Sequence, residues 1–127
     1  MNLLLDTHAM LWFWLNDPNL SRKATQAIED ADLAYISPAS YWELAIKIGL
    51  GKYALPMDYA LFLRQQIALN EFEILPIEVQ HTAVLTSLPL HHRDPFDRLL
   101  VAQAMVEGIP IVSNDPVLDA YPVERLW

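Results

Sequence analysis

The sequence begins with a short apolar run that ends in a carboxylate, Leu3-Leu4-Leu5-Asp6. Four further short runs have the composition of buried strands, at residues 34–37, 73–76, 109–113 and 123–126. Segments with the apolar period of helices lie between and around them, at residues 8–15, 21–31, 38–48, 58–69, 77–88 and 95–107. Strands that alternate with helices predict an α/β fold, a three-layer α/β/α sandwich with a central, mostly parallel sheet.

Length and composition describe a single globular domain over residues 1–127. Hydrophobic residues make up 54% of the chain and only 3 residues are glycine, which excludes disorder. The absence of cysteine excludes thiolate chemistry and disulfides, so the cytoplasm is the expected compartment. The apolar runs are too short to span a bilayer and the first residues lack a basic segment, so we expect no membrane association and no signal peptide.

Two aspartates lie at or just after the ends of predicted strands. Asp6 comes after Leu3-Leu4-Leu5, and Asp115 comes shortly after Ile111-Val112. The carboxyl ends of parallel strands meet at one edge of a sheet, where open α/β sheets carry their functional groups. We therefore expect both carboxylates at that edge, although each is also placed to cap the helix that follows it.

A third acid lies on the helix predicted at residues 38–48. Ser40, Glu43 and Lys47 are spaced at i, i+3 and i+7 and form one polar stripe on an otherwise apolar helix. This pattern predicts that Glu43 faces a polar cleft. An ion pair between Glu43 and Lys47, one turn further on, is the simpler alternative.

Two more acids open the helix predicted at residues 95–107. This helix carries no charge between Arg98 and Glu107, so it is expected to be largely buried, with polar function only in its first turn. Asp94 before Pro95 has the pattern of a helix cap. For Asp97 the local spacing leaves capping and catalysis equally open.

Carboxylates gathered at one edge repel one another unless a cation lies among them. Oxygen ligands, without cysteine or a histidine pair at i, i+4, favour Mg²⁺ or Mn²⁺ over zinc. Such an ion activates water and polarises a phosphoryl oxygen, so the cluster predicts phosphodiester hydrolysis. The net charge of -8 argues against binding of phosphates by the protein alone, and bound divalent cations would offset part of that charge.

Four motifs occur in order along the chain. They are Leu4-Leu5-Asp6-Thr7-His8-Ala9, Ser40-Tyr41-Trp42-Glu43-Leu44-Ala45-Ile46-Lys47, His92-Arg93-Asp94-Pro95-Phe96-Asp97-Arg98-Leu99-Leu100 and Ile111-Val112-Ser113-Asn114-Asp115. Together they resemble the PIN domain and, more narrowly, the VapC-type toxins of bacterial toxin–antitoxin pairs. The resemblance extends from the first predicted strand to the end of the chain.

The resemblance implies a Mg²⁺- or Mn²⁺-dependent endoribonuclease that acts on RNA, is inhibited by a small cognate antitoxin and forms a homodimer. The residues that match the acidic metal ligands of the family are Asp6, Glu43, Asp97 and Asp115, with Asp94 as a fifth catalytic candidate. Thr7 and Ser113 match positions that orient carboxylates or water.

Basic residues near these motifs are candidates for binding RNA phosphates, and we expect this role for Lys47 and Arg93. The other basic residues of the region are expected to be solvated, namely Lys52, His91, His92 and Arg98. His8 and His81 are expected to be structural. The tryptophans fit a core first, and a groove for the antitoxin or for a second copy of the chain is the alternative.

Two other functions stay open at this point. One is a PIN nuclease that processes RNA without an antitoxin. The other is a non-catalytic interaction module whose acids bind a regulatory cation or only cap helices.

Overall fold

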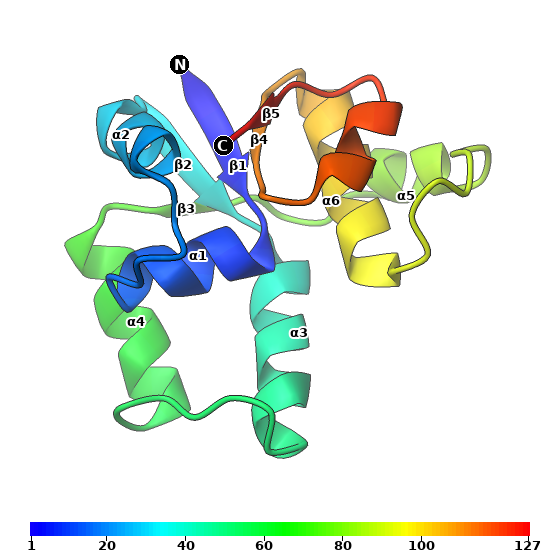
Figure 1. The fold of residues 1–127 in the computed structure, drawn as a ribbon. Helices are drawn as coiled ribbons and strands as arrows, with labels where there is room; N and C mark the ends of the chain where they lie inside the picture. The colour runs from blue at the N-terminus through cyan, green and yellow to red at the C-terminus, as the bar shows by residue number, and fades with distance from the viewer.

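A five-stranded sheet forms the centre of the molecule in the computed structural model, which describes all 127 residues (Figure 1). The strands are β1 (Asn2–Leu5), β2 (Leu33–Ile36), β3 (Glu73–Ile74), β4 (Ile111–Val112) and β5 (Arg125–Leu126). Their order in the sheet is β3-β2-β1-β4-β5, and every neighbouring pair is parallel. The sheet predicted to be mostly parallel is therefore entirely parallel.

Six helices and one 3₁₀ helix surround this sheet. They are α1 (Thr7–Trp14), α2 (Arg22–Asp30), α3 (Pro38–Gly49), α4 (Tyr59–Leu69), α5 (Val79–Leu85), α6 (Pro95–Glu107) and the 3₁₀ helix η1 (Pro116–Ala120). Helix α2 begins after the cap Ser21, and α6 ends at Gly108, whose φ of 65° is the left-handed conformation that glycine adopts without strain. The helix predicted at residues 77–88 is shorter than expected and spans Val79–Leu85; a capping box of Glu78 and His81 marks its start.

The side chains of β1 alternate between two cores. Leu3 and Leu5 belong to a core that α1, α2 and α4 cover, whereas Leu4 belongs to a second core with residues of α6. The neighbouring strands keep the same register, because Leu4 pairs with Tyr35 on one side and with Ile111 on the other. Both faces of the sheet are thus buried, which confirms the three-layer α/β/α architecture.

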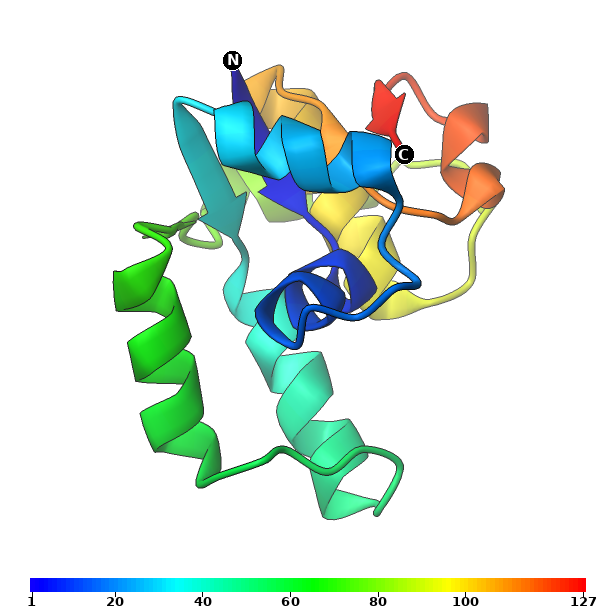
Figure 2. The same cartoon turned by 60° about the vertical axis from the view of Figure 1, so that its left-hand side comes forward.

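Two helices begin directly after the carboxyl ends of central strands. The chain passes from β1 into α1 through Asp6, and from β2 into α3 through Ser37. Helices α3 and α4 extend beyond this edge of the sheet and lie side by side in both views (Figures 1 and 2). None of the helices combines the length and the apolar character needed to cross a membrane.

Candidate active site

Asp6 is the residue between β1 and α1 and is buried, with 5% of its surface exposed. Its Oδ1 accepts a hydrogen bond from the Ala9 amide at 2.8 Å, so Asp6 caps α1 as the sequence pattern allowed. Burial raises the pKa of Asp6, and the nearby Ser113 hydroxyl offsets part of this rise. Ser113 is itself fully buried beside the site, where the resemblance placed it.

Glu43 is buried on α3 and is held by two side chains. The Thr7 hydroxyl donates a hydrogen bond to Glu43 Oε1 at 2.6 Å, and Lys47 Nζ lies 2.8 Å from Glu43 Oε2. The partial burial of Lys47 acts to lower its pKa, but the hydrogen bond and charge of Glu43 outweigh this and the pKa rises. The predicted polar stripe and the Glu43–Lys47 ion pair are therefore both present.

The first turn of α6 holds Asp94 and Asp97. Asp94 Oδ1 accepts hydrogen bonds from the Phe96 amide at 2.8 Å and the Asp97 amide at 3.3 Å, so Asp94 is the cap of α6. Burial raises the pKa of Asp97 to about 7, and the negative charges of Asp94, Asp6 and Glu43 add to the rise. These couplings indicate that acids from α1, α3 and α6 lie within electrostatic reach of one another.

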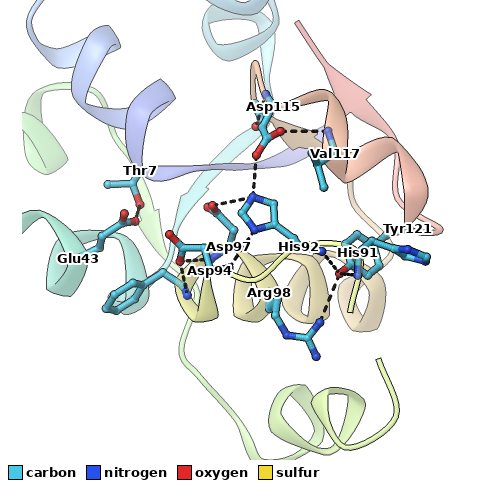
Figure 3. Close-up of polar contacts among 12 residues, drawn as sticks. Thr7, Glu43, His91, His92, Asp94, Asp97, Arg98, Asp115, Val117 and Tyr121 are labelled. Atoms are coloured by element: carbon cyan, nitrogen blue, oxygen red, sulfur yellow. Dashed lines mark hydrogen bonds and ion pairs between the residues drawn. The ribbon is translucent and has the colours of Figure 1, made fainter. Parts of the chain in front are cut away.

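Asp115 enters the same cluster from the start of η1 (Figure 3). Its Oδ1 accepts a hydrogen bond from the Val117 amide at 3.0 Å and caps η1. Its Oδ2 lies 2.7 Å from His92 Nε2, and the same nitrogen is 3.3 Å from Asp97 Oδ2. The expectation that His92 is a solvated loop residue is therefore wrong, because the packing of the α5–α6 loop against η1 brings its ring between two acids.

The donor groups of this cluster fit a hard divalent cation. Asp6, Glu43, Asp97 and Asp115 supply carboxylate oxygens from four different elements, and atoms of His92, Asp97 and Asp115 lie within 4.8 Å of one another. Ser40, three residues before Glu43 on α3, has a buried hydroxyl without a hydrogen-bond partner. Buried acids with raised pKa values, together with an unpartnered buried hydroxyl, are typical of a functional site.

Two of the basic residues, Arg93 and Lys47, are the predicted phosphate contacts, and Arg98 is one of those predicted to be solvated. Arg93 is exposed and its side chain makes no hydrogen bond or ion pair, and Lys47 is paired with Glu43. Arg98 points away from the acids, because its guanidinium donates hydrogen bonds to the Leu88 and Pro89 carbonyls. The prediction that Arg98 is a solvated side chain is therefore wrong, because its hydrogen bonds hold the loop that precedes α6.

His81 and His8 have structural contacts, as the sequence suggested. His81 is fully buried, and its Nδ1 accepts a hydrogen bond from the Glu78 amide at 3.0 Å. His8 Nε2 lies 2.9 Å from the Tyr53 hydroxyl, between α1 and the segment after α3. The histidine that sequence reasoning missed, His92, carries one local signal, its position two residues before a helix cap.

Comparison with known proteins supports one family. The model of the PIN domain matches residues 3–124. Ribonuclease VapC22 of Mycobacterium tuberculosis is 32% identical over 114 residues, which cover 89% of this chain and 86% of that protein.

Solved structures share the fold. VapBC2 from Rickettsia felis, bound to a DNA fragment from its promoter, aligns over 100% of both chains with a TM-score of 0.71 and 18% identity. FitAcB from Neisseria gonorrhoeae covers 97% of this chain and 95% of that chain, with a TM-score of 0.69 and 18% identity. With its parallel sheet, its acids at the carboxyl edge and a family match over nearly its whole length, this chain belongs to the PIN domain family.

Proposed function

We propose that this protein is a Mg²⁺- or Mn²⁺-dependent endoribonuclease that acts as the toxin of a toxin–antitoxin pair. The observation that carries the proposal is the acid cluster around Asp97: burial and the charges of Asp94, Asp6 and Glu43 raise the pKa of Asp97 to about 7, and His92 links Asp97 to Asp115. A relative named as a ribonuclease, matched over 86% of its length, supports the choice of reaction.

In this proposal the four carboxylates hold the cation, and neighbouring side chains keep them in place. Thr7 orients Glu43 through its hydrogen bond, and Ser113 partners Asp6. A bound Mg²⁺ or Mn²⁺ supplies the Lewis acidity that polarises the phosphoryl oxygen and makes water a better nucleophile. Lys47 and the unpaired Arg93 are the proposed contacts for RNA phosphates at the rim of the cluster.

Cleavage of a labelled RNA by the purified protein tests the reaction. We expect cleavage with Mg²⁺ or Mn²⁺ and none with EDTA. Attack by water leaves no 2′,3′-cyclic phosphate, so the chemistry of the product ends separates this activity from that of a contaminating metal-independent ribonuclease. Absence of cleavage together with absence of cation binding in calorimetry would instead support a non-catalytic interaction module.

The partner part of the proposal has support from exposed apolar surface. A groove between α3 and α4 is lined by six apolar side chains and one arginine; the residues are Tyr41, Tyr59, Ala60, Leu63, Ile67, Ile74 and Arg64. Trp14 is buried in the core, but Trp42 is 59% exposed on α3. An antitoxin segment or a second copy of the chain would cover such surface.

Co-expression distinguishes a toxin from an RNA-processing nuclease. A toxin should arrest growth when expressed alone, and a small protein encoded beside its gene should restore growth and block RNA cleavage in vitro. Normal growth during active RNA cleavage would favour the processing nuclease. Light scattering of the isolated protein tests the proposed homodimer.

A further inference from the structure

The loop between α5 and α6 carries an imidazole ring into the acid cluster. His92 Nε2 lies 2.7 Å from Asp115 Oδ2 and 3.3 Å from Asp97 Oδ2, and 15% of the side chain is exposed (Figure 3). The two carboxylates come from different elements, η1 and α6. One ring nitrogen, Nε2, therefore contacts both Asp97 and Asp115.

The hydrogen bond at the other ring nitrogen, Nδ1, identifies the tautomer of His92. The backbone amide of Asp94 lies 3.1 Å from His92 Nδ1. An amide N–H only donates, so Nδ1 must carry a lone pair and the proton must be on Nε2. Nε2 is then a hydrogen-bond donor toward the two carboxylates, and a protonated nitrogen cannot ligate a metal.

The backbone that carries His92 is fixed by a buried tyrosine. The Tyr121 hydroxyl accepts hydrogen bonds from the His91 and His92 amides at 3.1 and 2.9 Å, and donates one to the Pro89 carbonyl at 2.8 Å. Tyr121 is 4% exposed, and Arg98 also donates to the Pro89 carbonyl at 2.9 Å. The hydrogen bonds of Tyr121 therefore hold the backbone of the loop that carries the His92 ring.

We infer that His92 is a positioning residue that holds the Asp97 and Asp115 carboxylates ready for the cation. Its Nε2–H lies between them and limits their rotation, and Tyr121 acts on the site only by holding the loop of His92. The inference rests on the proposed function, because it assigns these acids to a cation. It differs from a simple ligand role, in which His92 itself would bind the metal through Nε2.

Calorimetric titration with Mn²⁺ and Mg²⁺, without RNA, tests the positioning role. His92→Phe removes the donor and should weaken cation binding about 10- to 100-fold, the usual effect of losing a hydrogen-bond partner of a ligand. His92→Gln offers an N–H donor again and should recover part of the affinity. His91→Phe is the matched control, since this exposed neighbour keeps its edge contact with Tyr121 and should bind cations like the wild type.

Tyr121→Phe gives a second variant that touches none of the acids. It removes the acceptor of both loop amides, so it should weaken cation binding in the same direction as His92→Phe, but less. Wild-type affinity in His92→Phe, or tighter binding there, would overturn the inference. Absence of cation binding in the wild type would contradict the proposed function itself. Cation binding that is equal in the wild type and in His92→Phe would contradict only the positioning role of His92.

Nuclear magnetic resonance of the histidine side chains separates positioning from ligation. Long-range proton–nitrogen correlations should show the proton of His92 on Nε2 in the metal-free protein and still on Nε2 after Mg²⁺ is added. A proton on Nδ1, or loss of the Nε2 proton on addition of Mg²⁺, would overturn the assignment and make His92 a metal ligand.

Discussion

Asp6 combines a structural role with a proposed chemical one, and replacement by asparagine separates them. Asp6→Asn keeps an oxygen that accepts the hydrogen bond from Ala9, but it removes a buried charge and a proposed ligand. We expect RNA cleavage to fall by at least about 100-fold. Removal of a metal ligand should reduce activity at least as much as removal of a residue that hydrogen-bonds to a ligand. The melting temperature without metal should stay equal or rise, since burial raises the pKa of Asp6.

The control for this variant is Asp58→Asn. Asp58 caps α4 in the same way, through the Leu61 amide at 3.1 Å, but lies outside the acid cluster. It should cleave RNA like the wild type. Full activity in Asp6→Asn would remove Asp6 from the mechanism.

Asp97 should give the metal-free protein a stability that depends on pH. Its pKa rises from 3.8 to about 7 on folding, so between these values the unfolded chain loses a proton that the folded chain keeps. The free energy of unfolding should therefore fall as pH increases from about 4 to about 7, by about 3 kcal/mol. Chemical denaturation across this range in EDTA measures the slope.

Asp97→Asn should reduce that slope, leaving the part that Asp6 contributes in the same direction. Asp119→Asn is the comparison, because Arg125 lowers the pKa of Asp119 and its titration lies below this range. An unchanged slope in Asp97→Asn would contradict the burial of an ionisable carboxyl at this position.

At the scale of single elements, the start of α6 raises the question of whether Asp94 only caps the helix. Asp94→Asn keeps the acceptor for the Phe96 and Asp97 amides and should preserve stability. Asp94→Ala loses the cap and should lower the free energy of unfolding by about 1 kcal/mol. For a residue that only caps, Asp94→Asn should reduce Mn²⁺ affinity less than about tenfold. A loss as large as that in Asp6→Asn would make Asp94 a fifth ligand.

The end of α6 depends on the conformation of one glycine. Gly108 has a φ of 65°, so Gly108→Ala places a side chain in the left-handed region although no atom would contact it. We expect a loss of about 1 kcal/mol in the free energy of unfolding. Gly49→Ala is the matched case, because this site is equally open but helical, and it should stabilise the protein by up to about 1 kcal/mol. Equal effects of the two substitutions would contradict the assigned backbone.

For the whole molecule, cation binding should be visible as stability. The acid cluster joins α1, α3, α6 and η1, so a cation that binds only the assembled site stabilises the entire fold. A Mn²⁺ concentration 100 times the Kd should add about 2.7 kcal/mol, measured as a rise in melting temperature against EDTA at equal ionic strength. Asp6→Asn should lose most of this rise. An equal rise in both proteins would mean that the ion binds elsewhere.

The sequence predicted the elements better than their lengths. The fold class is confirmed, because β1 follows the apolar run Leu3-Leu4-Leu5 and α6 lies over residues 95–107 as expected. Strands β3, β4 and β5 are shorter than their apolar runs. Residues 109–113 form a strand only at Ile111–Val112, since a strand ends where its neighbours stop pairing, and pairing is not local in sequence.

The sequence by itself determined where the acids fall. Apolar runs that end in Asp6 and Asp115, and a polar stripe that carries Glu43, follow from patterns within one element, so they can be seen without a structure. Only the tertiary structure decided which groups meet. His92 lies more than twenty residues from Asp115, and Thr7 lies 36 residues from Glu43. Such contacts depend on loop packing and on the assembly of the sheet, and no local periodicity encodes them.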